Sequence, residues 1–258
     1  TPMKTVSALH VMLQGSRVGE LVDAPGRGIY FSYDPSWLAN GFNLAPLYMD
    51  FSSAPQLAAD ALLFGGLQGA FSDSLPDGWG LLLMDRFFRT QLGMERRAIG
   101  PLERLAYMDN RGMGALEYKP AFEKRPEQNE LDLASLYQAS QEVLSGESKD
   151  VIESLRLAGG SPGGARPKAV MGLSSDKTQA ISSFGEMPEG YEHWLIKFRS
   201  QEEHPDSGAI EQAYALMARI AGVEISDSAL LEVETATAIE RFFVTRRFDR
   251  VGLTKRHM

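Results

Sequence analysis

Ten consecutive residues decide how this chain is interpreted: Gly159-Gly160-Ser161-Pro162-Gly163-Gly164-Ala165-Arg166-Pro167-Lys168. Glycines let the backbone approach a ligand closely and turn its N–H groups toward phosphate oxygens. Arg166 and Lys168 add positive charge at the same place. The stretch is not a Walker A loop, because Ala165 stands where that motif requires Lys, and it lacks the spacing G-x-G-x-x-G. It predicts a phosphate-binding loop; a flexible glycine loop without a ligand is the alternative.

A lysine and a glutamate follow this loop in the order that a kinase requires. Lys197 lies in an otherwise apolar predicted strand, like the kinase lysine that holds the α- and β-phosphates. Alternatively, it is an edge-strand lysine that discourages aggregation. Glu211 lies in the first turn of the next predicted helix, where a kinase glutamate pairs with the strand lysine. The positive end of a helix also favours an acid there, but loop, lysine and glutamate in this order favour the kinase interpretation.

The second half of the chain predicts the order strand, strand, helix, strand, strand. The strands are expected at residues 169–173, 191–198, 229–233 and 239–244. The helix is expected to begin at Asp206 or Ser207 and to end at Gly222. Its apolar residues recur at helical spacing: Ile210, Tyr214, Met217, Ala218 and Ala221. This order is that of a protein-kinase small lobe.

The first half predicts a small antiparallel β-module followed by helices. Strands are expected at residues 6–13, 17–22 and 29–33, and a short helix after Asp34. Further helices are expected from the N-cap Asp77 to Gly93 and at residues 101–108, 131–144 and 149–158. The charged segment 123–130 reads as a linker, so the predicted domains are 1–125 and 126–250, and the fold class is α+β.

Composition excludes several kinds of protein. The chain of 258 residues has a net charge of -8, so it is a poor nucleic-acid binder by itself. It has no Cys, which excludes disulfides, thiolate metal sites and Cys nucleophiles. Its four His are scattered and predict no metal site and no triad. No apolar run approaches the ~18 residues of a membrane span and no signal peptide is visible, so we expect a cytoplasmic protein without a membrane partner.

Four motifs together resemble the HipA-type serine/threonine kinases, the toxins of bacterial HipBA toxin–antitoxin pairs. Ser161–Lys168 resembles the phosphate loop of that family. Asp34–Leu38 resembles its amino-terminal module, Ser74–Gly78 its L-P-[DE]-G turn, and Arg247–Arg250 its signature at the hinge. The resemblance covers nearly the whole chain. It implies a HipA-like amino-terminal subdomain joined to a kinase-like small lobe.

The resemblance also implies roles for individual residues. Lys197 would bind the α- and β-phosphates with Glu211 as its orienting partner, and residues 245–248 would form the hinge against adenine. Ser161 aligns with the serine that family members autophosphorylate, which ejects the loop; a simple turn residue is the alternative. Arg246 departs from the glutamate that is frequent at the hinge. The implied ATP-binding set is Ser161, Gly163, Gly164, Ala165, Lys168, Lys197, Glu211, Thr245, Arg246 and Phe248.

The implied activity is transfer of the γ-phosphoryl group of ATP, with Mg²⁺, to protein serine. Family targets include aminoacyl-tRNA synthetases, so growth arrest and persistence would follow. A HipB-like antitoxin would neutralise the toxin, and DNA would be reached only through that antitoxin. The alternatives are a non-catalytic module that binds an antitoxin or regulator and, less favoured, a small-molecule or lipid kinase.

The catalytic residues are expected outside this chain. A kinase needs a catalytic-loop Asp, an Asn and a further metal-binding Asp, all after the hinge, yet no Asn follows Asn129. His204-Pro205-Asp206 precedes the hinge and reads as a helix cap. We therefore expect residues 251–258 to begin a carboxy-terminal helical lobe that is largely absent. The chain as given would then be inactive and bind ATP weakly or not at all.

Overall fold

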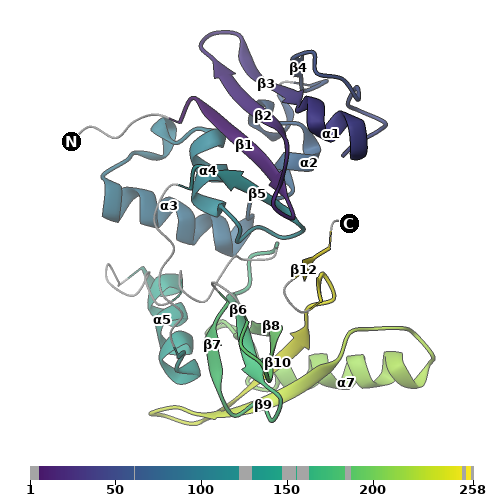
Figure 1. Cartoon of the computed structure of the whole chain (residues 1–258). Helices are drawn as coiled ribbons and strands as arrows, with labels where there is room; N and C mark the ends of the chain where they lie inside the picture. Colours follow the sequence, from purple (N-terminus) through teal and green to yellow (C-terminus); the bar gives the residue numbers. More distant parts are fainter. Residues whose placement is uncertain are drawn as a thin grey trace. The chain divides into compact units, whose positions relative to one another are not determined.

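The computed structural model describes residues 6–60, 62–121, 130–146, 155, 163–183, 187–251 and 254–256. The chain forms two compact units. Unit 1 comprises residues 1–76, 91–124 and 255–258, and unit 2 comprises residues 77–90 and 125–254. Figure 1 labels most of the helices and strands of both.

Unit 1 contains a five-stranded antiparallel sheet in the order β4-β3-β2-β1-β5. Buried and partly exposed residues alternate along β1, as the two-residue period of a half-buried strand requires. Gln14 and Gly15 join β1 to β2 with positive φ angles of 49° and 80°, which suits a tight hairpin. The strands are β1 (Ala8–Leu13), β2 (Ser16–Ala24), β3 (Gly28–Tyr33), β4 (Gln56–Leu57) and β5 (Leu116–Lys119).

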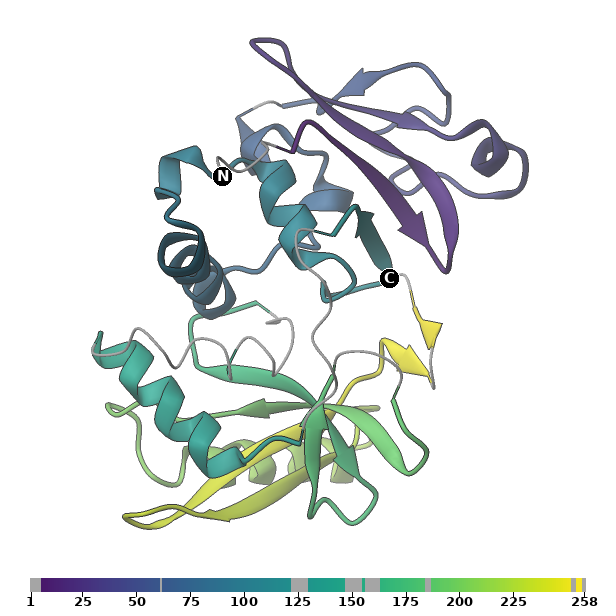
Figure 2. The same ribbon diagram turned by 60° about the vertical axis from the view of Figure 1, so that its left-hand side comes forward.

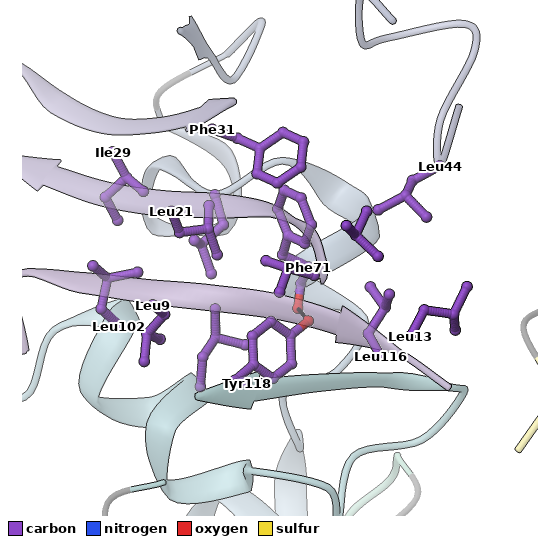
Figure 3. Close-up of a cluster of buried hydrophobic side chains, with 14 of the residues drawn as sticks. Leu9, Leu13, Leu21, Ile29, Phe31, Leu44, Phe71, Leu102, Leu116 and Tyr118 are labelled. Atoms are coloured by element: carbon purple, nitrogen blue, oxygen red, sulfur yellow. Dashed lines mark hydrogen bonds between the residues drawn. The ribbon is translucent and has the colours of Figure 1, made fainter. Parts of the chain in front are cut away.

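Short helices complete unit 1, and aromatic residues fill its core. The Asp34 carboxylate accepts the Ser36 N–H and so caps the first helix. Phe31 and Phe71 lie with their ring centroids 4.7 Å apart in the core that Figure 3 shows. The helices are α1 (Pro35–Asn40), η1 (Leu63–Gly66), α2 (Gly69–Ser72), η2 (Arg96–Ala98) and α4 (Pro101–Met108). The predicted antiparallel β-module with helices is confirmed.

Unit 2 contains a second five-stranded antiparallel sheet, in the order β7-β6-β8-β10-β9. Its strands are β6 (Lys168–Ser174), β7 (Ala180–Ser182), β8 (Tyr191–Lys197), β9 (Ser228–Glu234) and β10 (Ile239–Arg246). Strand β7 was not predicted from the sequence, because three residues are too few to show a period. The short strands β11 (Arg250–Val251) and β12 (Thr254–Lys255) pair with each other.

One face of the second sheet is apolar and packs against helix α5 (Leu133–Ser145), which Figure 2 shows beside the sheet. The ring of Tyr137 on α5 lies 6.2 Å from Phe198 and 5.1 Å from Phe242. Asp132 caps this helix, and Gly146 ends it with a φ of 84°. Residues next to these apolar ones along β6, β8 and β10 point to the opposite face of the sheet, because side chains alternate along a strand.

Two further helices belong mainly to unit 2, α3 (Gly78–Leu92) and α7 (Ser207–Ile220). Helix α7 has its N-cap at Asp206, as predicted, although the Asp206 side chain makes no capping hydrogen bond. Gly222 follows with a φ of 81° and donates its N–H to Arg219. The apolar residues at helical spacing form no core here, because Ile210, Tyr214 and Met217 are 50%, 68% and 61% exposed.

The spatial division differs from the predicted domains at two places. Units 1 and 2 meet in sequence at Lys124/Arg125, beside the boundary predicted at residue 125. However, residues 77–90 belong to unit 2, and residues 255–258 belong to unit 1. There the Lys255 ammonium group is 3.4 Å from Glu117. The predicted linker lies outside the described residues except for Glu130, and the helix predicted at residues 149–158 does so except for Leu155.

Candidate functional site

The described part of the glycine loop, residues 163–167, leads directly into β6. Gly164 has a φ of 102°, a backbone conformation that residues with a side chain rarely adopt. The Lys168 ammonium group donates to the Gly163 carbonyl, so the lysine folds back on its own loop. Gly159, Gly160, Ser161 and Pro162 lie outside the described residues.

Residues 77–79, at the start of α3, hold this loop by hydrogen bonds and are called its seat below. The Gly164 N–H donates to the Asp77 carboxylate, and the Gly164 carbonyl accepts the Trp79 N–H at 3.0 Å. The Trp79 indole N–H donates to the Lys168 carbonyl at 3.1 Å. Gly78 has a φ of 43°, and a Cβ atom there would meet the Gly164 oxygen at 2.5 Å. From the sequence, Asp77 was expected to be an N-cap and part of the Ser74–Gly78 motif, and its hydrogen bond to the loop was not predicted.

The predicted lysine–glutamate pair is formed. The Lys197 ammonium group on β8 lies 2.6 Å from the Glu211 carboxylate on α7. Gly208 makes this approach possible, because a Cβ atom there would meet the Arg241 carbonyl of β10 at 2.3 Å. Phe243 is opposite Lys197 in the register, and its ring centroid is 5.4 Å from the ammonium group. The short distance between helix and sheet therefore sets the position of the pair.

Lys168 is a second cation at the same place. It lies opposite Lys197 in the antiparallel register of β6 and β8, so both side chains emerge on one face. Only 8% of Lys168 is exposed. Burial lowers the pKa of its ammonium group, and the neighbouring positive charge of Lys197 lowers the pKa further. An anion bound between these two lysines would relieve both effects.

Arg166 joins the loop to the ion pair, a connection that the sequence analysis missed. Its guanidinium donates to Glu211 and also to Glu203, with 2.7 Å between the Arg166 Nε and Glu203 Oε1 atoms. Glu203 Oε2 accepts the Ser200 N–H at 2.8 Å. Desolvation raises the pKa of the Glu203 carboxyl, but the Ser200 N–H and Arg166 outweigh it and hold the pKa below its ordinary value.

The predicted hinge residues make other contacts. Thr245 lies opposite Leu195 in the register, and its hydroxyl donates to the Asp227 carbonyl at 3.3 Å. Arg246 pairs with Glu192 at 3.1 Å and with the Asp227 carboxylate at 2.9 Å. Phe248 is 66% exposed. No described contact joins these three residues to the Lys197–Glu211 pair.

Beside the hinge, the sequence analysis missed a buried ion network. Asp249 Oδ1 accepts from Arg247 Nε at 2.8 Å, and Asp249 Oδ2 accepts from Arg250 Nη1 at 2.7 Å. All three side chains are less than a tenth exposed. The signature Arg247–Arg250 is thus a structural feature as well as a sequence motif.

The described part of the chain shows no group of three or more His, Asp or Glu residues that could hold a metal ion. Within that same part, no helix has the length and apolar character needed to cross a membrane.

Two sequence models of known families match the chain: the HipA N-terminal domain at residues 9–119 and the HipA-like C-terminal domain at residues 160–258. No curated protein matches the sequence. Because a C-terminal family domain is matched here, the expectation that the carboxy-terminal lobe is largely absent is not confirmed and stays a prediction.

One similar solved structure is the complex of the Shewanella oneidensis MR-1 toxin–antitoxin proteins HipA and HipB with their operator DNA. The identity is 14%, the TM-score is 0.60, and the match covers 96% of this chain and 54% of that chain. This chain therefore spans about half the length of the solved one. At this identity the match shows the fold. With both family domains matched in their expected order, the chain belongs to the HipA family.

Proposed function

We propose that this chain holds the nucleotide in a HipA-type kinase that transfers the γ-phosphoryl group of ATP to protein serine. The observation that carries the proposal is the 2.6 Å ion pair between Lys197 and Glu211, on the sheet face that Lys168 shares. Lys197 would contact the α- and β-phosphates, and Glu211 would orient it. The backbone of residues 161–165 would cover the phosphates, with the Gly164 N–H held by Asp77.

The charges of the residues suit a phosphate chain. Lys168 is a buried cation whose pKa is lowered by burial and by Lys197, and a bound phosphate would add to the counter-charge that Asp77 and Glu211 supply. The loop that carries it is held through Gly164 against Asp77 and Trp79, so its backbone is preorganised. Mg²⁺ would enter with ATP and neutralise part of the phosphate charge. Thr245, opposite Leu195 in the register, would lie toward the adenine with Arg246 and Phe248.

Partners and regulation belong to the same proposal. A HipB-like antitoxin is supported by the similar structure, whose complex contains HipB and operator DNA. The substrate would be a protein such as an aminoacyl-tRNA synthetase, the site of action the cytoplasm, and the effect growth arrest. Autophosphorylation is proposed at Ser161, which lies outside the described residues. A binding module without kinase activity is the second candidate, and nucleotide titration separates the two.

The test is a titration of the 258-residue chain with Mg·ATP, monitored by NMR through the backbone amide chemical shifts, which detect weak binding. We expect shifts around residues 163–168 and at Lys197. Lys197→Met removes a charge-assisted bond of ~1.5–3 kcal/mol, so affinity should fall roughly 10–150-fold in an intact kinase that contains this chain, and the weak shifts of this chain should be lost. Lys177→Met is the matched control, because Lys177 packs over Trp194 instead of pairing with Glu211.

Equal affinity of the Lys197→Met variant and the wild type would contradict the proposed role of Lys197. A correctly folded chain that shows no shifts at millimolar Mg·ATP would contradict nucleotide binding by this chain alone. If an intact protein that contains this chain also failed to bind Mg·ATP, the non-catalytic binding module would be favoured.

A further inference from the structure

Arg166 connects three parts of unit 2. It stands at the end of the glycine loop, two residues before β6 begins. Its guanidinium reaches Glu211 in α7 and Glu203 in the segment between β8 and α7. Glu203 is itself anchored, because its other oxygen accepts the Ser200 N–H at 2.8 Å. The guanidinium is therefore held by an anchored carboxylate, Glu203, and also contacts Glu211.

The atoms used by each partner determine what Arg166 does to the ion pair. Arg166 donates to Glu211 Oε1, whereas Lys197 donates to Glu211 Oε2 at 2.6 Å. The two cations therefore do not compete for one oxygen. Arg166 instead fixes the orientation of the carboxylate, so that the second oxygen points at Lys197.

We propose that Arg166, held by Glu203, is a positioning residue for the Lys197–Glu211 pair and couples the seated glycine loop to the phosphate-binding lysine. This inference rests on the proposed function and adds a positioning residue to it. With Gly164 held by Asp77 and Trp79, Arg166 reaches Glu211, so that Glu211 contacts two cations.

The network differs from an ordinary surface ion pair, which contributes little because two mobile side chains must be ordered in water. The side chains of Arg166, Glu203, Glu211 and Lys197 are between 25% and 32% exposed. Each carboxylate here has at least two donors. Lys197 and Glu211 lie on a strand and a helix, and Glu203 is held by the Ser200 N–H. Several charges in one network justify expecting a measurable effect.

The first measurement is amide hydrogen exchange of residues 210–213 in the nucleotide-free chain. Arg166→Met should speed exchange in this turn of α7, because Glu211 loses its anchor. Arg166→Lys, which keeps the charge but loses the fork, and Glu203→Gln, which keeps an acceptor but loses the charge, should have smaller effects in the same direction. Arg17→Met is the control, since Arg17 bridges two acids, Glu20 and Asp34, within unit 1.

The second measurement is a double-mutant cycle on Mg·ATP affinity. Arg166→Met alone should weaken binding about tenfold, the factor of ~1.4 kcal/mol. In a Glu211→Ala background, the same Arg166→Met substitution should weaken Mg·ATP binding less than about twofold, because Glu211, through which Arg166 acts, is absent. A residue that only stabilises the fold, or touches the nucleotide directly, would give the full loss in both backgrounds.

The outcomes separate the two proposals. If residues 210–213 exchange equally in Arg166→Met and wild type, the positioning role is wrong even where Lys197→Met abolishes ATP binding. Full additivity in the cycle would overturn it as well. If Arg166→Met speeds amide exchange at residues 210–213 but neither the wild type nor any variant binds ATP, the positioning of Glu211 by Arg166 stands and the proposed kinase function fails.

Discussion

The two units each contain a five-stranded antiparallel sheet, but the polar and charged side chains packed on the two sheets differ. The core of unit 1 is aliphatic and aromatic. Its buried polar groups include the neutral pair of Ser74 and Tyr118, 2.7 Å apart, and two acids: Glu103, which accepts the Val6 N–H, and Asp109, which pairs with Lys119. Unit 2 has an equivalent apolar core on one sheet face only. On the other face it places Lys168 and Lys197, and it adds the buried network around Asp249. Unit 2 differs in placing two lysines opposite each other on neighbouring strands, where their like charges repel.

This difference has an energetic consequence. Buried ions are costly to desolvate and contribute little net stability, but removing one partner leaves the other charge unpaired. A neutral apolar core loses stability in proportion to the volume removed. Unit 1 should therefore respond to changes of volume and unit 2 to changes of charge.

The largest expected effect is in the apolar core of unit 1. Phe71→Ala should lower the free energy of unfolding by about 3–5 kcal/mol, because Phe71 is fully buried against Phe31. Urea unfolding followed by circular dichroism measures the loss, which should not change with salt. Phe42→Ala is the matched control at a site 46% exposed. A loss for Phe71→Ala as small as that of the control would refute the assignment of this core.

Removing a buried charge tests unit 2. Asp249→Asn should cost about 3 kcal/mol, because Arg247 and Arg250 lose a shared carboxylate while buried. The fluorescence of the buried Trp79 and Trp194 reports unfolding of this unit. Asp227→Asn, at a side chain 60% exposed, should cost only about 0–1 kcal/mol. Equal losses for the two variants would show that burial of the charge makes no difference.

The pH dependence of the Asp249 contribution follows from its pKa. Burial raises the pKa of the Asp249 carboxyl, but Arg247 and Arg250 outweigh burial and lower it below the ordinary 3.8. The folded state therefore holds this proton less tightly than the unfolded state. The stability from this carboxylate is fully present above the ordinary pKa and is lost as pH falls through the lower folded value. Asp249→Asn should flatten the stability profile in that acidic range.

The seat of the glycine loop should respond to a single added carbon. Gly78→Ala places a Cβ atom 2.5 Å from the Gly164 oxygen at a φ of 43°, so we expect a loss of about 1–3 kcal/mol. Amide exchange at residues 163–165 should become faster. Gly190→Ala is the control, since its φ is also positive but nothing lies within 4 Å of the added carbon. The difference between the two variants isolates the contact with the loop, and identical behaviour would argue against that contact.

The sequence predicted most of the regular structure because its signals are local. Residues 101–108 form the expected helix, and Lys197 and Glu211 meet as their order in a kinase lobe implied. The amphipathic spacing in α7 predicted the helix, but not which side would face the sheet. Gly208 decides this, because its missing side chain brings that side of the helix against β10.

The connections between distant segments could not be predicted. Asp77 and Gly164 are 87 residues apart, and nothing in either segment alone indicates that one accepts a hydrogen bond from the other. Arg166 and Glu203 are each ordinary charged residues in loops, and their pairing depends on how β6 and β8 align. A local pattern identifies which residues have the right chemistry, and the register between strands determines which of them meet.

The smallest effect distinguishes the two units most sharply. Tyr118→Phe should cost about 1 kcal/mol, because the buried Ser74 hydroxyl loses its partner. Replacing both, Ser74→Ala with Tyr118→Phe, should recover part of that loss, since a neutral pair removed together leaves no polar group unsatisfied. Denaturant unfolding of the four chains gives the coupling energy, and simple additivity would contradict a direct bond. In unit 2, the equivalent double change Lys197→Met with Glu211→Ala should likewise be tolerated by the fold, because both charges leave together and Arg166 keeps Glu203 as its partner. Under the proposed function it should not restore Mg·ATP binding, because the lysine that would contact the phosphates is gone.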